Sequence, residues 1–268
     1  MDAIDIAREQ LRAFEAGKPF ATVTIVDAKG TTSRTYSKML VFADGTAVGT
    51  VGGSDKEKAA IADAVACIRT GKPVLRTYGD GIPSADGKCC GGEFTMFIEP
   101  SPARPRLVVV GGGHVGGAVL RLGKFLGYDT WLVDNRDEEF LADKLPLASR
   151  FIPIKDYEAD LRALDIPPDS FVVLCSYSHA TDGAALAAML EKDCAYLGML
   201  GSRKKIARLL AGLEARGYDT RLFRRIRTPI GLDLGGETPE EVALSILSEI
   251  QAVRYGRPGT VFPSRTGV

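Results

Sequence analysis

The stretch VVVGGGHVG, at residues 108–116, decides the fold of this chain. Three of its glycines are spaced as Gly-x-Gly-x-x-Gly: Gly111, Gly113 and Gly116. An apolar run at 107–110 precedes them, and a run with helical character at 118–126 follows. A strand, a tight glycine turn and a helix in this order are the context that a dinucleotide fingerprint requires. We therefore expect a helix N-terminus that presents N–H groups to a phosphate.

An acidic residue follows at the distance typical of such a fingerprint. Asp134 ends the next apolar run, TWLVD, and lies 21 residues after Gly113. In dinucleotide-binding folds an acid near this distance accepts hydrogen bonds from a ribose. The alternative is a glycine-rich turn between a strand and a helix that holds no ligand.

The second half of the chain alternates apolar runs with helical patterns. The expected strands are LVVV (107–110), TWLVD (130–134), RFIPI (150–154), FVVLCS (171–176), AYLGM (195–199) and TPIGLD (228–233). Such strands, separated by helices, are typical of a parallel sheet covered on both faces. We therefore predict a doubly wound, Rossmann-like α/β domain over 106–255, with strand order 3-2-1-4-5-6. Its last helix begins after Thr238 with a capping box, and 256–268 forms a tail.

The first hundred residues predict a smaller α+β domain over 1–100. A helix at 4–16 precedes β-branched and alternating runs, and the dipeptide Asp44-Gly45 between two of these runs indicates a hairpin. Three prolines follow within a few residues, so 101–105 is expected to be a stiff linker between the two domains.

Charge and cysteine usage narrow the class of protein. Basic and acidic side chains balance at 34 each, so no overall field attracts nucleic acid or an acidic membrane surface. No export signal and no apolar run of about 18 residues is present, and we expect a cytoplasmic protein. The five cysteines are an odd number in such a chain, which favours reduced thiols.

Both histidines fall at the sheet end where doubly wound folds bind ligands. His114 lies in the glycine turn, and His179 follows the fourth expected strand. We expect the two imidazoles to face one pocket. Asp182 would either orient the His179 imidazole or begin the next helix, and the second role is the commoner one.

The turn after the fifth expected strand, LGMLGSRKK, offers a second anion site. Ser202 is expected to cap the next helix, and Arg203, Lys204 and Lys205 lie in its first turn, where cations oppose the helix dipole. A helix N-terminus with added positive charge suits a phosphate. The alternative is a solvated basic face.

Cys89 and Cys90 differ from the other cysteines because they lie in a polar, glycine-rich loop at 79–92. Adjacent cysteines do not readily form a disulfide with each other, and no partner stands at zinc spacing nearby. The Cys90 thiol is the candidate to ligate a soft metal, carry sulfur or take part in redox chemistry. The alternative is a pair of structural loop thiols.

Several stretches together resemble one family over nearly the whole chain. They are GTVGGSDKE (49–57), CGG (90–92), FIEP (97–100), GGGHVG (111–116), VVLCSYSHATD (172–182), YLGMLGSRKK (196–205) and RIRTPIGLDLGGETPEEVALSILSEI (225–250). In these stretches the chain resembles the XdhC/CoxI proteins, accessory factors for the maturation of xanthine dehydrogenase and related molybdenum hydroxylases. The resemblance implies a chaperone rather than an enzyme.

The resemblance also implies a cargo and partners. A protein of this kind binds the molybdenum cofactor (molybdopterin, in a mono- or dinucleotide form) and protects it while a cysteine desulfurase replaces an oxo ligand by sulfur. It then delivers the cofactor to the apo-hydroxylase. A pterin with a phosphate end and a metal end suits a cleft between two domains, where we expect it to bind.

The candidate cofactor-binding residues come from the fingerprint and the resemblance together. They are Gly52, Gly53, Glu57, Cys90, Gly111, Gly113, His114, Gly116, Asp134, His179, Asp182, Ser202 and Arg203, with Cys90 also the candidate metal ligand. One departure matters, because many relatives have a cysteine or a further glycine where this chain has Ser54. Cys90 is therefore left as the candidate thiol. Ser54 and Glu57 also match a capping box for the helix that follows.

Two other functions stay open. An NAD(P)-dependent oxidoreductase is favoured by the fingerprint and Asp134, although Arg136 could meet a 2′-phosphate instead. No acid–base constellation beyond the two histidines supports it. The third candidate is a nucleotide-sensing interaction module. The sequence leaves open which hydroxylase is served and whether the chain forms a homodimer.

Overall fold

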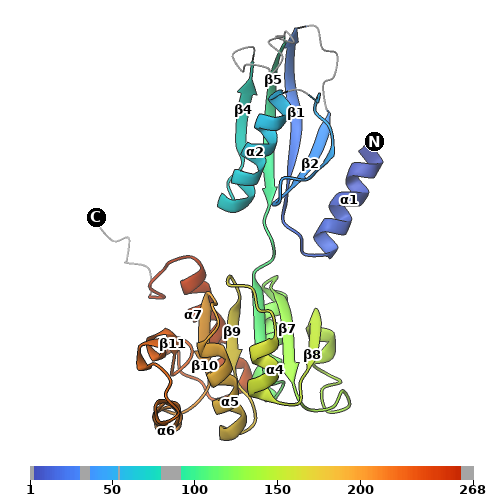
Figure 1. Cartoon of the computed structure of the whole chain (residues 1–268). Coiled ribbons are helices and arrows are strands. Elements are labelled where there is room, and N and C mark those ends of the chain that lie inside the picture. Colours follow the sequence, from blue (N-terminus) through green and yellow to red (C-terminus); the bar gives the residue numbers. More distant parts are fainter. Residues whose placement is uncertain (1–2, 31–36, 54, 80–91, 261–268) are drawn as a thin grey trace, which may run out of the picture. The chain divides into compact units, whose positions relative to one another are not determined.

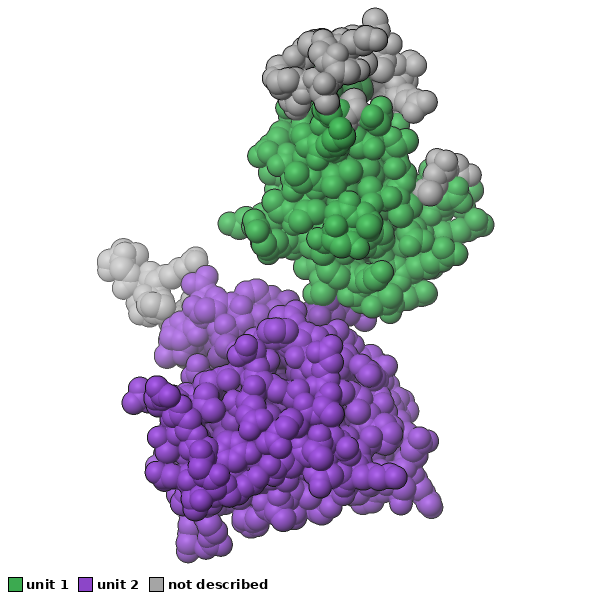
Figure 2. All heavy atoms as spheres, viewed as in Figure 1, with its two compact units in different colours: residues 1–103 green, residues 104–268 purple. Residues whose placement is uncertain are grey.

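The computed structural model of the chain forms two compact units, Met1–Ala103 and Arg104–Val268 (Figures 1 and 2). The structure describes residues 3–30, 37–53, 55–79 and 92–260. No helix in these ranges is both long and apolar enough to cross a membrane.

The second unit is built on a parallel six-stranded sheet. Its strands are β6 (Arg106–Val110), β7 (Asp129–Asp134), β8 (Arg150–Pro153), β9 (Phe171–Leu174), β10 (Tyr196–Met199) and β11 (Ile226–Arg227). The order is β11-β10-β9-β6-β7-β8, and every neighbouring pair is parallel. This is the predicted order 3-2-1-4-5-6 read from the other edge, so the Rossmann-like prediction is confirmed.

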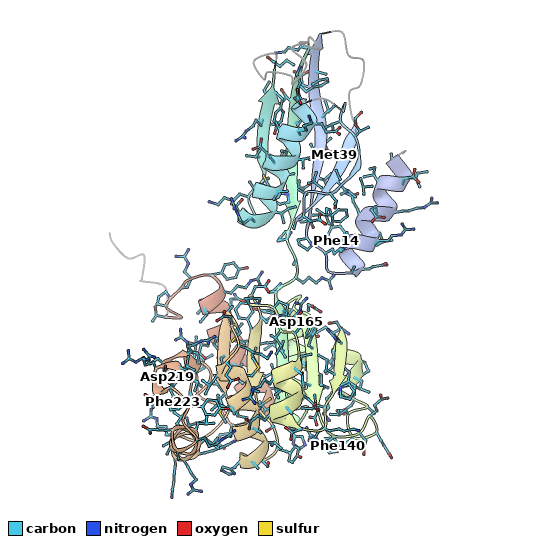
Figure 3. All side chains as sticks on the ribbon, in the orientation of Figure 1. Phe14, Met39, Phe140, Asp165, Asp219 and Phe223 are labelled. Atoms are coloured by element: carbon cyan, nitrogen blue, oxygen red, sulfur yellow. The ribbon has the colours of Figure 1, made fainter. Side chains whose placement is uncertain are left out.

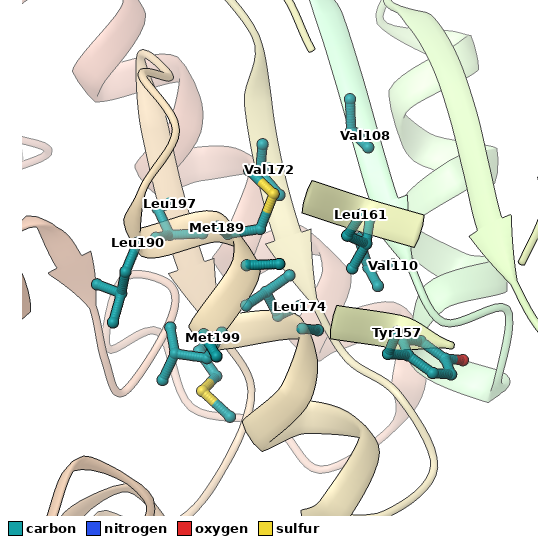
Figure 4. Packing of buried hydrophobic residues seen from close by; sticks show 14 of the residues in the cluster. Val108, Val110, Tyr157, Leu161, Val172, Leu174, Met189, Leu190, Leu197 and Met199 are labelled. Atoms are coloured by element: carbon teal, nitrogen blue, oxygen red, sulfur yellow. The ribbon is translucent and has the colours of Figure 1, made fainter. Parts of the chain in front are cut away.

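Helices cover both faces of this sheet, which explains why its strands are apolar throughout. They are α3 (His114–Phe125), α4 (Tyr157–Ala163), α5 (His179–Leu190), α6 (Arg203–Ala215) and α7 (Pro239–Arg254), with short 3-10 turns η1 (Leu145–Leu147) and η2 (Thr220–Arg225). In β6, Val108 and Val110 pack with α4 and α5 (Figures 1 and 4), whereas Leu107 and Val109 pack with α3 and α7. Burial of each such side chain contributes about 1.5–3 kcal/mol.

Two sequence predictions need correction. The sixth strand is β11, and the predicted strand at 228–233 is wrong. Pro229 has no N–H to donate to a ladder, and the Gly231 N–H donates to the Glu249 Oε2 of α7 at 2.8 Å instead. The helix after the glycine turn begins at His114 rather than at 118.

The capping box predicted for the last helix is confirmed. The Thr238 Oγ1 accepts a hydrogen bond from the Glu241 N–H at 3.3 Å, and the Glu241 Oε2 accepts one from the Thr238 N–H at 2.9 Å. Pro239 occupies the first helical position, where its missing N–H costs nothing.

The first unit is an antiparallel sheet with two helices, as predicted. Its elements are α1 (Ala3–Glu15), β1 (Phe20–Gly30), β2 (Lys38–Phe42), β3 (Ala47–Gly49), α2 (Asp55–Thr70), β4 (Val74–Tyr78) and β5 (Gly92–Ser101). The strand order is β3-β2-β1-β5-β4. Ala60, Ala64 and Cys67 of α2 pack on the sheet, and α1 packs through Ile6 and Ala13 in a second cluster. The predicted hairpin turn joins β2 to β3.

Candidate functional site

The glycine turn is held by two close backbone approaches. Gly111 has φ +111°, and a Cβ there would lie 2.6 Å from the Cys175 oxygen and from the Ser176 Cα. A Cβ on Gly116 would lie 1.9 Å from the Gly111 oxygen. The end of β6, the end of β9 and the first turn of α3 therefore meet only because these two residues are glycines.

Gly113 is a glycine for a different reason. Its φ is −73° and its ψ is −165°, a conformation open to any residue, and a Cβ there would meet nothing within 4 Å. Gly113 also lines a pocket. The protein itself therefore does not require a glycine here, whereas a ligand that approaches the backbone closely would.

The N-terminus of α3 is left open for a partner. The other four helices of this unit are capped by side chains, those of Asp156, Ser178, Ser202 and Thr238. α3 begins after Gly113, which has no side chain, and its first residues, His114 and Val115, line a pocket. Such a helix end carries free donors and a partial positive charge, which suits an anion.

The pocket lies where the parallel strands β6, β7 and β9 end, and its volume is about 310 Å³. It is lined by Gly113, His114, Val115, Arg136, Phe140, Lys144, Cys175, Ser176, Tyr177 and Leu200. Figure 3 labels Phe140 at this end of the second unit. This is the crevice in which doubly wound sheets bind their ligands.

Asp134 is fully buried and organises the pocket. Its Oδ2 accepts hydrogen bonds from the Gly112 N–H at 2.6 Å and the Arg136 Nη2 at 2.5 Å, and its Oδ1 accepts from Arg136 N and Nε, both at 2.9 Å. Burial opposes its ionisation, but these bonds outweigh burial and hold the pKa of Asp134 below its usual value. Asp134 therefore positions the glycine turn and Arg136, in place of the ribose contact that the sequence suggested.

The Arg136 guanidinium lies close to two aromatic rings at the pocket. Its guanidinium carbon is 4.4 Å from the ring centroid of Phe140 and 5.3 Å from that of Tyr177. The Lys144 Nζ lies 5.5 Å from the Phe140 centroid. The hydrogen bonds to Asp134 raise the pKa of Arg136, so its charge is permanent. The pocket thus combines cationic side chains, each paired with a carboxylate, with flat aromatic rings.

Cys175 lines the pocket as a neutral thiol. Its side chain is buried, and its Sγ donates to the Gly111 oxygen at 3.3 Å. Burial raises the pKa of Cys175 to about 12. At neutral pH the thiol is protonated and is a small packing group rather than a nucleophile.

The two histidines are not brought together. His114 is exposed and lines the pocket, whereas His179, also exposed, is the first residue of α5 and is not among the lining residues. The prediction that both imidazoles face one pocket is therefore wrong. The reason is local, because Ser178 caps α5 and the neighbouring Tyr177 takes the place beside the pocket.

Asp182 joins the pocket to the start of α6 and does not orient His179. It is fully buried, and its Oδ1 accepts hydrogen bonds from Ser176, including one from the Ser176 N–H at 3.0 Å. Its Oδ2 forms an ion pair with Lys205. Asp182 thus fixes Ser176 in the pocket wall.

The basic turn contributes less than its charges suggest. Ser202 caps α6 as predicted and accepts a hydrogen bond from the Lys205 N–H at 3.3 Å. The Lys205 ammonium pairs with Asp182, and Arg203 and Lys204 are exposed. Leu200 lines the pocket, but the residues from Ser202 to Lys205 do not.

In the first unit, Glu57 holds the loop that contains Gly52 and Gly53, in the stretch GTVGGSDKE, by hydrogen bonds. Its Oε2 accepts hydrogen bonds from the Thr50 hydroxyl at 2.5 Å, the Val51 N–H at 2.8 Å and the Gly53 N–H at 3.0 Å. Burial opposes ionisation, but these donors keep the pKa of Glu57 below its usual value. Gly52 and Gly53 have φ of +136° and +67°, which favours glycine.

The candidate thiol, which is also the candidate metal ligand, is Cys90. Cys89, Cys90 and Ser54 lie outside the described residues. Within the described ranges, no group of three or more histidine, cysteine, aspartate or glutamate side chains could hold a metal ion.

Two family models match this chain. The model of the XdhC Rossmann domain matches residues 107–250, and the model of the XdhC and CoxI family matches residues 13–79. This chain belongs to the XdhC/CoxI family. The predicted resemblance is confirmed.

Relatives of this XdhC/CoxI protein span different lengths. Escherichia coli (strain K12) YqeB is 36% identical over 96% of this chain and 47% of its own length. The E. coli molybdenum cofactor insertion chaperone PaoD is 26% identical over 93% of this chain and 88% of its own length. A probable xanthine dehydrogenase subunit from Bacillus subtilis (strain 168) is 26% identical over 59% of this chain and 46% of its own length. The match thus spans about half the length of YqeB and of the B. subtilis protein.

A solved structure supports the fold of this XdhC/CoxI protein. The structure of a xanthine dehydrogenase from Bacillus halodurans covers 95% of this chain and 97% of its own, with a TM-score of 0.50 and 22% identity.

The sequence did not single out the two aromatic residues and the lysine that line this pocket, Phe140, Tyr177 and Lys144. Tyr177 lies inside the matched stretch VVLCSYSHATD, next to the capping Ser178, and could have been found there. Phe140 and Lys144 lie in the segment after β7, where no spacing pattern marks them.

The two functional glycines of this XdhC/CoxI turn should respond differently to substitution. Gly116→Ala places a Cβ against the Gly111 oxygen and should lower the free energy of unfolding by about 3 kcal/mol or more. Gly113→Ser adds a good helix cap in open space and should leave the free energy of unfolding within about 1 kcal/mol of the wild-type value. Urea denaturation measures both. Equal losses for the two variants would contradict the geometry.

The Asp182–Lys205 pair should be essential to stability. Lys205→Met leaves a buried carboxylate without its cation and should cost about 3–5 kcal/mol of unfolding free energy. The double variant Asp182→Asn with Lys205→Met should regain part of that loss, because no charge is stranded. Lys204→Met, on the exposed neighbour, is the control and should change stability by less than about 0.5 kcal/mol. A Lys205→Met protein as stable as this control would contradict the pairing.

Proposed function

We propose that this protein binds the molybdenum cofactor and assists its insertion into a molybdenum hydroxylase of the xanthine dehydrogenase type. Membership of the XdhC/CoxI family supports the proposal, as do relatives named as a molybdenum cofactor insertion chaperone and a probable xanthine dehydrogenase subunit. In the proposal, the apo-hydroxylase and a cysteine desulfurase are the partners.

One observation carries the proposal to this chain: the uncapped N-terminus of α3 opens on a pocket with fixed positive charge. The phosphate end of a pterin cofactor would lie against Gly113, with the first N–H groups of α3 as donors. Arg136 and Lys144 would supply the counter-charge. His114, at the rim, is the further candidate contact.

The other candidate residues have supporting roles in this proposal. Gly111 and Gly116 permit the turn, Asp134 holds it to Arg136, and Asp182 fixes the wall at Ser176. His179, Ser202 and Arg203 do not line the pocket, so we assign them no contact with the phosphate end.

The metal end is assigned to the first unit. Thiolates are preferred ligands of soft metals, so Cys90 remains the proposed contact of the molybdenum centre during sulfuration. The glycine loop of Gly52 and Gly53, which Glu57 holds by hydrogen bonds, is the proposed support of the pterin. Holding the cofactor and excluding water from it are the tasks of a chaperone and need no general acid or base.

The NAD(P)-dependent oxidoreductase is the weaker candidate. The carboxylate of Asp134 already accepts four hydrogen bonds from Gly112 and Arg136, so it is not placed to accept from a ribose. The two histidines do not share the pocket. Hydride transfer from NAD(P)H to a carbonyl compound, catalysed by the purified protein, would revive this candidate.

The test is to express the protein with the cofactor pathway active and to purify it without oxygen. Molybdenum, measured by mass spectrometry, and pterin, measured by fluorescence after oxidation, should each co-purify in about equimolar amounts. Gly113→Ser, which fills the approach to the α3 N-terminus but keeps the fold, should retain far less of both. A folded preparation without molybdenum or pterin would contradict the proposal.

Cys90→Ala separates handover from binding. The variant should keep its pterin but lose the ability to activate the apo-hydroxylase in a reconstitution assay. Cys194→Ala, which removes a thiol outside the pocket, is the control and should activate normally. Full activation by the Cys90→Ala protein would contradict the role of the thiol.

A further inference from the structure

The pocket offers one surface that a phosphate alone does not use. Phe140 is 52% exposed and Tyr177 is 56% exposed, and their ring centroids lie 4.4 and 5.3 Å from the Arg136 guanidinium carbon. We propose that this stack receives a nucleobase, so that the pocket binds a nucleoside diphosphate group. The inference rests on the proposed function, because it concerns the same pocket.

Contacts within the protein hold the stacking surface in place without a ligand. The Asn135 Nδ2 donates to the Tyr177 hydroxyl at 3.2 Å, and the Tyr157 ring packs against the Tyr177 ring with centroids 6.5 Å apart. Two side-chain hydrogen bonds to the Asp134 carboxylate fix the orientation of the Arg136 guanidinium. Exposed aromatic rings and a guanidinium, held in place before the ligand arrives, are the groups on which bases stack.

The positive charge is available to phosphates. Nε and Nη2 of Arg136 are bonded to Asp134, and none of the described residues accepts a hydrogen bond from Nη1. The Lys144 Nζ pairs with Asp143, whose side chain is 68% exposed, and such a surface pair is weak and can be exchanged. A diphosphate between α3 and these two cations would be well compensated.

The volume of the pocket suits a group of nucleotide size. About 310 Å³ lies at the lower end of the range of roughly 300–1,000 Å³ for small-molecule sites. The pocket therefore accommodates one nucleotide-sized group. That group is either a free nucleotide or the nucleotide half of a larger cofactor.

The ribose should contribute little to recognition. In dinucleotide sites of this fold the acid after the second strand accepts the ribose hydroxyl, but here both oxygens of Asp134 face Gly112 and Arg136. Base and phosphates, rather than the sugar, would then determine the affinity. This separates the pocket from a standard NAD site.

Titration calorimetry of the purified full chain with ADP, CDP, GDP and inorganic pyrophosphate tests the inference. At least one nucleoside diphosphate should bind about tenfold more tightly than pyrophosphate, because only the nucleotides have a base to stack. Its 2′-deoxy form should bind within about threefold of the ribose form. Equal affinity for pyrophosphate and for all three nucleotides would overturn the inference.

Variants locate the base. Tyr177→Ala and Phe140→Ala should each weaken nucleotide binding about tenfold and leave pyrophosphate binding unchanged, whereas Tyr177→Phe keeps the ring and should bind normally. Phe125→Ala is the matched control, since Phe125 is 84% exposed at the far end of α3. Lys144→Met should weaken the binding of both nucleotide and pyrophosphate, whereas Lys204→Met, on an exposed lysine that does not line the pocket, is its control. Nucleotide binding that is indifferent to Tyr177 and Phe140 would overturn the inference.

Acid hydrolysis of the co-purified cofactor identifies the source of the nucleotide. Release of a nucleoside monophosphate in equal amount to the pterin assigns the pocket to the nucleotide half of the cofactor. Pterin without nucleotide, together with tight binding of a nucleoside diphosphate, assigns it to a free nucleotide. Both results support the inference.

The two proposals fail in different ways. Molybdenum and pterin that co-purify without nucleotide, from a protein that binds no nucleoside diphosphate, would overturn the inference and leave the proposed function standing. Tight nucleotide binding by a protein that never retains molybdenum or pterin would support the inference and overturn the proposed function.

Discussion

The carboxylate of Asp134 is the group on which the pocket depends. It is buried at the end of β7, where an unpaired charge would cost several kcal/mol, and it is stabilised by the Gly112 N–H and by Arg136. The same bonds pull the glycine turn against β7 and hold the guanidinium close to Phe140 and Tyr177. One buried charge thus sets both the position of the α3 N-terminus and the orientation of the stacking surface.

A second buried carboxylate has the matching task across the pocket. Asp182 accepts hydrogen bonds from Ser176 at the end of β9 and pairs with Lys205 at the start of α6. The pocket therefore lies between two neutralised ion pairs, one after β7 and one after β9. Neither pair adds net charge to the pocket, so the attraction for an anion comes from α3, from the outer edge of Arg136 and from Lys144.

The sequence predicted the parts of this structure that follow from local patterns. Apolar runs separated by helices predicted the strand order of the sheet and the positions of five of its six strands, and the turn at Gly111 and Gly116 lies where the fingerprint required it. The sixth strand was predicted too far along the chain, at 228–233. That segment makes tertiary hydrogen bonds instead, such as the one from the Gly231 N–H to the Glu249 carboxylate. Spacing located Asp134 and Asp182 correctly but could not show which way their carboxylates point. The stack of Phe140, Arg136 and Tyr177 joins two connections far apart in the chain, and no periodicity records it.

The groups that line the pocket are suited to binding an anionic ligand. The Cys175 thiol, with a pKa of about 12, is protonated at neutral pH, and the only histidine at the pocket, His114, lies exposed at the rim. Both buried carboxylates are committed to ion pairs, so neither is free to move a proton. What remains active toward a ligand is a set of cationic side chains, the N–H donors of the α3 N-terminus and flat rings, and such groups bind and orient an anion. A glycine at position 113, which the fold does not need, is consistent with the same purpose, because it lets a bound group approach the helix end closely.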